Sequence, residues 1–476
     1  MIFSLISNRL WKKHKTQFYH RRFALTQIAG FLLGGFTMTQ NTTTHTNRPR
    51  LQDIFILGFA FFATYFGAGN LIFPPQLGLN SGTEFIAGLS GLTLSGIFLP
   101  IFTLIVIGLN GDVHAITDRV GKYTYNVLLA ALMIVCTFVS IPRTAATAIQ
   151  LGIQGNIPAA PFIPLVILYF VISYFFVADQ NNVMDRMGKY LTPLLALILV
   201  VIAIAGVVSP LGTPVDPAVP NPFVNAFLGG YNTGDVLVSF IMAAVFIQSI
   251  RSKGYQTIKQ RNTCLIYCGI VAFVLLFVIY GSLLYMGACV SGDYPQTIGR
   301  AELLVAIISR FGSAVMIPMG VAVVLACLTT AIGQVAAVAQ FTSGFSRKAS
   351  YKKMAILCSF LSALTALLGV DGIVTYVGWV YSISYPPCLA LLVLGVLAKV
   401  TPNNGACKGA VYLVTLYALI EALPFLSDLA IAKAIVAATP LSAYGFGWVV
   451  PFIAGYITGA LIGAVAGKRS DATAQA

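Results

Sequence analysis

Apolar runs separated by short polar segments follow one another along almost the whole chain. Nearly every run is long enough to form a helix that crosses roughly 30 Å of hydrocarbon, and the sixth run is short. We expect helices rather than strands, because every backbone polar group in a bilayer must find an internal partner. The pattern predicts an all-α, polytopic membrane protein with 12 transmembrane helices, at residues 54–79, 84–109, 125–151, 161–178, 188–208, 235–250, 263–289, 313–343, 352–369, 372–398, 409–426 and 445–467.

Composition excludes a soluble protein. Of the 476 residues, 58% are hydrophobic and only 9% are charged, whereas soluble domains have roughly 25% charged residues. The mean hydropathy of +0.87 also excludes a disordered chain, which would be poor in apolar residues and rich in charge.

The basic residues orient the helices. The net charge of +14 arises from clusters between apolar runs, such as Arg251–Arg261 and Arg347–Lys353, which is unlike a continuous nucleic-acid-binding face. Beyond residue 37, 18 bases fall on one side of the predicted membrane, and the three on the other side are Arg300, Arg310 and Lys433. Positive charge marks the cytoplasmic side, so both termini are expected there, with a lipid bilayer as partner and no nucleic acid.

The N-terminal segment, residues 1–37, differs from the rest of the chain. A basic stretch precedes an apolar run, Phe23–Thr37, that is too short to span a membrane. Met38 begins a polar segment suited to a cytoplasmic N-terminus at residues 38–52. We interpret residues 1–37 as an upstream extension that does not belong to the working protein. The alternatives are an interfacial amphipathic segment and an extra weak helix.

Enzyme chemistry finds little support in the sequence. The four histidines, His14, His20, His45 and His114, all lie outside the apolar runs, and no CxxC pair occurs. We therefore expect no catalytic residues, no buried histidine-ligated metal and no cofactor.

One stretch of the first run carries candidate chemistry. Two glycines and an asparagine, Gly67, Gly69 and Asn70, lie in mid-span, and Pro74 and Pro75 follow. Glycine weakens a helix, and proline removes a donor. Unwound backbone at membrane depth can bind a cation through its carbonyls and a carboxylate through its N–H groups. The alternative is a close helix contact through the glycines with an ordinary proline kink.

This stretch, GFAFFATYFGAGNLIFPPQLGL (Gly58–Leu79), resembles the first-helix signature of the branched-chain amino acid:cation symporter family, the bacterial leucine, isoleucine and valine carriers. Ile141–Thr144 (Ile-Pro-Arg-Thr) and residues 221–225 (Asn-Pro-Phe-Val-Asn) extend the resemblance. The resemblance implies a leucine-transporter-like fold, in which two inverted repeats of five helices precede two appended helices. The repeats are expected at residues 53–208 and 209–400, and the appended helices and tail at residues 401–476.

The resemblance also implies a sodium site and a break in the sixth span. The sodium ligands would be the carbonyl oxygens of Ala63, Phe66 and Ala326 and the hydroxyl groups of Thr329 and Thr330. The break in the sixth span is expected near Met242-Ala243-Ala244. From the residues alone, the two threonine hydroxyls could equally bond back to their own helix.

The implied substrate site lies beside the first break. The N–H groups of Ala68 and Gly69 would bind the substrate carboxylate. Carbonyls near Tyr65 and Met242, and Ser239, would meet its ammonium group. The implied apolar pocket for the branched side chain contains Val139, Met242 and Phe246.

Ionisable residues within the predicted spans are scarce, and Arg143 is one of them. A charged side chain costs roughly 2.5–3.5 kcal/mol at mid-bilayer unless it is paired or hydrated. One interpretation is an extracellular gate formed with Asp371, and the alternatives are a structural ion pair and a side chain that snorkels to the interface. Asp235 is expected near the extracellular end of the sixth span.

The resemblance implies a secondary active transporter of the bacterial inner membrane. It would import L-leucine, L-isoleucine and L-valine by symport, with Na⁺ as the coupling ion. The alternative is a proton-coupled carrier, or a carrier of other small neutral amino acids, with the same fold.

Overall fold

The part of the chain that the structure describes is helical throughout. The computed structural model describes residues 49–475 except 180–182, 232, 345–348 and 427–428, and no β-strand occurs in these ranges. Within the helices, the side chains of 68, 313–314, 371, 374–378, 425–426 and 467–475 are not described. The predicted all-α class is therefore confirmed. The interpretation of residues 1–37 concerns residues outside this description.

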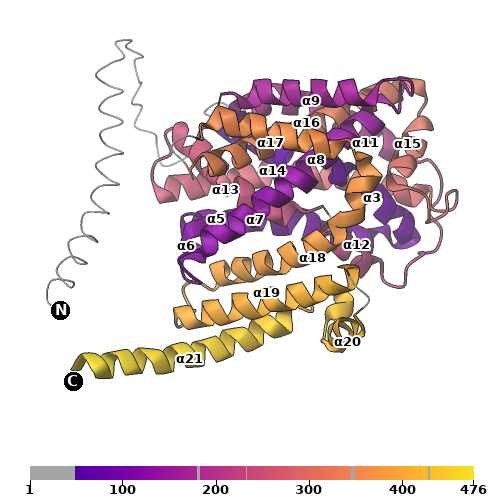
Figure 1. Ribbon diagram of the computed structural model, residues 1–476. Helices are drawn as coiled ribbons and strands as arrows, with labels where there is room; N and C mark the ends of the chain where they lie inside the picture. The colour runs from indigo at the N-terminus through magenta and orange to yellow at the C-terminus, as the bar shows by residue number, and fades with distance from the viewer. Residues whose placement is uncertain (1–48, 180–182, 232, 345–348, 427–428, 476) are drawn as a thin grey trace, which may run out of the picture. The chain divides into compact units, whose positions relative to one another are not determined.

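The helices follow one another closely (Figure 1). Short π-helical turns (η2 to η5) interrupt several of them, and η1 and η6 are 3₁₀ turns. In chain order the elements are α2 (Leu51–Tyr65), α3 (Ala68–Ser81), η1 (Gly82–Glu84), α4 (Phe85–Leu92), η2 (Thr93–Phe98), α5 (Leu99–Asn110), α6 (Val113–Thr117), α7 (Thr124–Val135), η3 (Cys136–Ser140), α8 (Ile141–Thr147), η4 (Ala148–Ile153), α9 (Phe162–Val177), α10 (Val183–Arg186), η5 (Met187–Leu191), α11 (Thr192–Val208), α12 (Pro222–Tyr231), α13 (Asp235–Ser252), α14 (Ile258–Cys289), α15 (Arg300–Ser309), α16 (Ser313–Ser343), α17 (Tyr351–Ala366), α18 (Gly369–Val396), α19 (Asn404–Leu426), α20 (Ala430–Ala438), η6 (Ser442–Tyr444) and α21 (Val449–Gln475).

Many of these helices suit a membrane. In the described residues, nine helical stretches are long and apolar enough to cross it, and α2 and α9 are shorter apolar helices. One of the nine, Gly69–Asn110, is a single stretch of 42 residues that contains the whole of the predicted second run and part of the first. All twelve predicted runs lie largely on helix, and the count of twelve crossings stays a prediction.

The first predicted run is broken between α2 and α3. Phe66 (φ −86°, ψ 84°) and Gly67 (φ −117°, ψ −165°) leave the helical conformation, and a new helix begins at Ala68. Pro74 and Pro75 lie inside α3 without ending it. The break therefore coincides with the glycines of the motif rather than with its prolines.

The second break lies earlier than the sequence predicted. Helix α13 runs unbroken through Met242-Ala243-Ala244, and the interruption falls before its start at Asp235, where Thr233 and Gly234 lie outside both α12 and α13. Gly234 has a left-handed conformation there (φ 83°), which glycine adopts without steric cost. The prediction of a break near Met242 is wrong, because alanine favours an intact helix.

The two interrupted segments form part of the buried core. Phe61, Phe62 and Phe66 of the first are fully buried, as are Met242 and Ala243 of the second. Helices α2 and α3 both pack on α14 and α16, and α13 packs on α5, α16 and α18. Both breaks therefore lie within protein, where irregular backbone at membrane depth is tolerated.

Helices α18, α19 and α21 lie side by side (Figure 1). Along the contact between α19 and α21, Gly405 and Gly409 face Gly455 and Gly459, and a Cβ atom on any of them would overlap backbone of the facing helix. Small residues four apart allow such close approach in membranes. This glycine seam joins the two C-terminal helices backbone to backbone.

Candidate functional site

Five oxygen atoms meet where the first break faces α16. The Thr330 hydroxyl donates to the carbonyls of Ala63 (3.2 Å) and Phe66 (3.3 Å). The Thr329 hydroxyl donates to the carbonyls of Ala326 (3.0 Å) and Ala63 (3.5 Å). These are the five predicted cation ligands, and the structure brings them together in a buried position.

The break explains why the Ala63 carbonyl is available. In a continuous helix this oxygen would accept the N–H of the residue four positions later, which is Gly67. The Gly67 N–H instead donates to the carbonyl of Tyr65 (3.1 Å). Thr329 back-bonds within α16, as the alternative interpretation expected, yet it also reaches Ala63. The two interpretations of the threonines are therefore compatible.

The cluster fits a cation of modest charge. Ca²⁺, which has nearly the same ionic radius as Na⁺, holds its oxygen ligands at about 2.3–2.6 Å. Oxygens at right angles around such an ion would lie roughly 3.2–3.7 Å apart, close to the measured hydroxyl–carbonyl distances of 3.0–3.5 Å. All five oxygens are uncharged, which suits a monovalent ion better than a divalent one.

The N-terminus of α3 lies across the break from this cluster. Gly67 is its N-cap, no side chain caps it, and the N–H groups of Ala68 and Gly69 begin the helix. Such N–H groups have no acceptor in their own helix and favour an anion. The N–H groups predicted to bind the substrate carboxylate therefore lie at the start of a helix, as the motif indicated.

Arg143 reaches this helix start from α8. Its Nη2 donates to the carbonyl of Thr233 (3.4 Å) in the second break, and Tyr381 is close enough to interact with it electrostatically. A Cβ atom on Gly69 would lie 3.3 Å from Nη2. Arg143 is only 7% exposed. This burial contradicts the interpretation that its side chain snorkels to the membrane interface. The proposed gate partner, Asp371, belongs to α18, but its side chain is outside the described residues.

A buried carboxylate that sequence reasoning had placed elsewhere joins the two breaks. Asp235 begins α13 in the interior and accepts a hydrogen bond from Asn70 Nδ2 (2.6 Å). Asn70 also hydrogen-bonds to the Tyr280 hydroxyl of α14. The sequence signal was the turn-like Asn-Thr-Gly before Asp235, which marks the end of α12 and not an extracellular loop.

The remaining predicted substrate contacts form a second polar group. The Tyr65 hydroxyl lies 2.9 Å from the Ser239 hydroxyl, and Ser239 donates to the carbonyl of Pro100 (2.9 Å). Met242 lies next to Gly333 of α16. Because α13 is intact here, the Met242 carbonyl is expected to accept a hydrogen bond within its own helix. The structure therefore places Tyr65 and Ser239 together and gives the Met242 backbone no role as an exposed acceptor.

The predicted apolar pocket residues lie in the same core. The Phe246 ring centroid lies 4.9 Å from that of Phe61 of α2, and Met242 and Phe246 are buried one turn apart on α13. Val139 is buried in the π-helical turn before α8.

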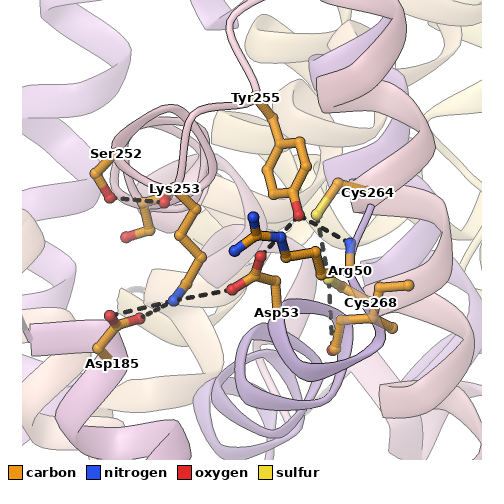
Figure 2. A network of polar contacts seen from close by, with 10 residues as sticks. Arg50, Asp53, Asp185, Ser252, Lys253, Tyr255, Cys264 and Cys268 are labelled. Carbon is orange, nitrogen blue, oxygen red and sulfur yellow. Dashed lines mark hydrogen bonds and ion pairs between the residues drawn. The ribbon is translucent and has the colours of Figure 1, made fainter. Parts of the chain in front are cut away.

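A polar network surrounds the start of α2 (Figure 2). The Tyr255 hydroxyl donates to Asp53 (2.7 Å), and Lys253 Nζ lies 3.4 Å from Asp53 and 3.0 Å from Asp185. Burial, and then the hydrogen bond to Asp53, raise the pKa of Tyr255 to about 12. The phenol therefore keeps its proton at neutral pH, and the contact between α2 and the α13–α14 loop persists. Cys268 lies directly beside α2, with Sγ 3.7 Å from the Ile54 carbonyl.

With the break and its surrounding groups described, comparison with known proteins identifies the family. Residues 50–466 match the family described as branched-chain amino acid transport protein. The chain belongs to this family. Its members are transporters, which agrees with the expectation that the protein is not an enzyme.

Named relatives match along nearly their whole length. The branched-chain amino acid permease BraB of Bacillus subtilis (strain 168) is 30% identical over 425 residues, covering 86% of this chain and 95% of the permease. The permease BrnQ of Corynebacterium glutamicum is 27% identical over 410 residues, covering 84% and 93%.

Solved structures share the fold of this branched-chain amino acid transport protein. A Na⁺-coupled sialic acid symporter superposes with a TM-score of 0.51 at 16% identity, covering 86% of this chain and 90% of that one. A nucleobase-cation-symport-1 family transporter gives 0.54 at 15% identity, covering 88% and 93%. The predicted leucine-transporter-like fold is confirmed at this level.

Proposed function

We propose that this multi-pass membrane protein is a secondary active transporter that imports L-leucine, L-isoleucine and L-valine together with Na⁺. It would lie in the bacterial inner membrane with both termini in the cytoplasm, as the distribution of positive charge favours. Family membership supports the substrate class. The observation that carries the choice of ion is the cluster of five neutral oxygens at the first break.

Sodium would bind between α2 and α16. The carbonyls of Ala63, Phe66 and Ala326 and the hydroxyls of Thr329 and Thr330 would contact it, and the two hydroxyls would turn their hydrogens away from those carbonyls. Because the cation joins the end of α2 to α16, it would hold the break in one geometry.

The substrate would bind on the other side of the same break. Its carboxylate would meet the N–H groups of Ala68 and Gly69, and Tyr65 and Ser239 would supply oxygens to its ammonium group. The buried Met242 and Phe246 would face its branched side chain, so that apolar surface is removed from water.

Coupling follows from the shared segment. Ion and substrate each stabilise one conformation of Phe66–Gly67, so each would raise the affinity for the other by the same factor. We further propose that residues 53–208 and 209–400 are the inverted repeats that move against each other, with residues 401–476 appended. The network of Asp53, Lys253 and Tyr255 would then close the cytoplasmic side.

Uptake by the purified full chain in proteoliposomes tests the proposal. An imposed inward Na⁺ gradient should drive leucine accumulation that unlabelled isoleucine and valine inhibit. The alternative is a proton-coupled carrier, favoured by the buried carboxylate of Asp235, which can accept a proton. Accumulation driven by a pH gradient without Na⁺ would establish that alternative, and the absence of saturable leucine uptake would refute both.

A further inference from the structure

We propose that Arg143 binds the substrate carboxylate directly, together with the N–H groups of Ala68 and Gly69. This inference deepens the proposed function and depends on it. It replaces the gate interpretation of Arg143 with a role in recognition, in which the guanidinium binds the negatively charged group that all α-amino acids share.

The first argument is the position of the guanidinium. A Cβ atom on Gly69 would lie 3.3 Å from Arg143 Nη2, so Nη2 lies beside the buried backbone of Gly69 in the first turn of α3. Because Gly69 has no side chain, the guanidinium can lie this close to the first turn of α3. Two sources of positive potential, the guanidinium and the helix N-terminus, are therefore close together.

The second argument is the unused hydrogen-bonding capacity of Arg143. The side chain is more than nine-tenths buried, and Nε has no hydrogen-bond partner in the described residues. The hydrogen bond from Arg143 Nη2 to the Thr233 carbonyl is long, at 3.4 Å. A buried guanidinium left in this state is costly, and a carboxylate that accepts from it would remove the cost.

The third argument is the charge balance around the site. Asp235 is close enough to Arg143 to interact electrostatically, but the two form no ion pair within 4.0 Å in the described part of the chain. Arg300 of α15 stacks 4.5 Å from the ring centroid of Phe73 in α3, and burial and the charge of Arg143 lower the pKa of Arg300. Arg143 thus interacts with one carboxylate and with a second guanidinium, and an entering carboxylate would balance the remaining positive charge.

Binding of ligands with and without a carboxylate tests the assignment. L-leucine and L-leucinamide share the side chain and the amino group, and only leucine carries the negative charge. In the full-length wild type, leucine should bind about 10- to 100-fold more tightly than leucinamide, as expected for hydrogen bonds to a charged group. The Arg143→Gln variant should lose a similar factor for leucine and bind leucinamide within about twofold of the wild type.

Controls separate recognition from folding. Stabilisation by Na⁺ in thermal unfolding should persist in Arg143→Gln, and Arg310→Gln, the same change at a more exposed arginine paired with Asp293, should leave both ligands unaffected. If Arg143→Gln does not fold, Arg143→Lys should still weaken leucine selectively, because lysine cannot donate in a bidentate fork.

Two results would overturn the proposal. Equal losses for leucine and leucinamide would indicate a purely structural arginine, and intact leucine binding with lost uptake would indicate a gate. A wild type that binds no branched-chain amino acid would refute the proposed function itself, and that failure is visible before any variant is made.

Discussion

At the scale of single residues, Thr330 makes the contact that links α16 to the end of α2 and to the first break itself. Its hydroxyl donates to the carbonyls of Ala63 and Phe66. The Thr329 hydroxyl donates to the carbonyl of Ala63 and to that of Ala326 in its own helix. Thr330 is therefore the side chain on which the proposed ion site depends most directly.

Replacing Thr330 by valine keeps its shape and removes its oxygen. We expect the Na⁺ concentration for half-maximal leucine uptake to rise about tenfold or more, since one of five ligands is lost. Uptake measured against Na⁺ concentration checks this, with Thr330→Ser as the control that restores the hydroxyl. An unchanged sodium dependence would remove Thr330 from the site.

Gly67 leaves room for that hydroxyl. A Cβ atom at Gly67 would lie 2.9 Å from Thr330 Oγ1 and 3.2 Å from its Cγ2, while its φ of −117° suits any residue. We therefore expect Gly67→Ala to weaken Na⁺ binding severalfold by displacing Thr330 and not by straining the backbone. Sodium-dependent thermal stabilisation measures the loss, and unaltered stabilisation would contradict the packing argument.

At the scale of elements, the second break depends on Gly234. An alanine there would carry a positive φ, which costs roughly 1–2 kcal/mol, and its Cβ would lie 2.7 Å from the Tyr381 hydroxyl. We expect Gly234→Ala to lower the free energy of unfolding by at least about 1–2 kcal/mol.

The matched control is Gly281→Ala in α14, where a Cβ would make only ordinary contacts at 3.6 Å. Alanine favours a helix over glycine by up to about 1 kcal/mol, so this variant should be neutral or more stable. Thermal unfolding in detergent compares the two. Equal stability of both variants would contradict a break that depends on Gly234.

The two breaks also show what the sequence could and could not predict. The first could be placed because glycines interrupt an apolar run next to a recognisable motif, and the family resemblance implied the oxygens of Thr329 and Thr330. The second could not, because α12 is amphipathic and short, and Asp235 at the start of α13 looks like a residue that ends a span. Only its burial and its hydrogen bond from Asn70, which also bonds to Tyr280, reveal that this aspartate is interior.

The role of Arg143 lay beyond sequence reasoning for a related reason. Periodicity places the residue within a span but does not state what its guanidinium faces. That depends on the approach of α8 to the start of α3 and to Thr233, which are distant in the chain.

At the scale of the whole molecule, the network of Asp53, Lys253 and Tyr255 holds α2 against elements from distant parts of the chain. Lys253 is largely buried between Asp53 and Asp185 (Figure 2). Loss of its charge leaves two carboxylates facing each other, so the segment should separate more readily.

We expect Lys253→Gln to speed the reaction of Cys268 with a water-soluble maleimide severalfold, because Cys268 is buried against α2. The measurement uses a chain in which the other seven cysteines are replaced. Arg186→Gln, which removes the more exposed pair with Asp179, is the control and should leave the rate unchanged. Equal rates in all three proteins would show that the network does not hold α2 closed.

The hydroxyls of Thr329 and Thr330 have one more consequence, which concerns how the site empties. Because each can donate to the same carbonyls that would face the proposed cation, departure of that ion would leave these carbonyls with hydrogen-bond partners. Rotation of the two hydroxyl groups would restore the hydrogen bonds. A carrier releases its ion in every transport cycle. A site whose polar groups hydrogen-bond to one another without the ion would lower the free-energy cost of that release.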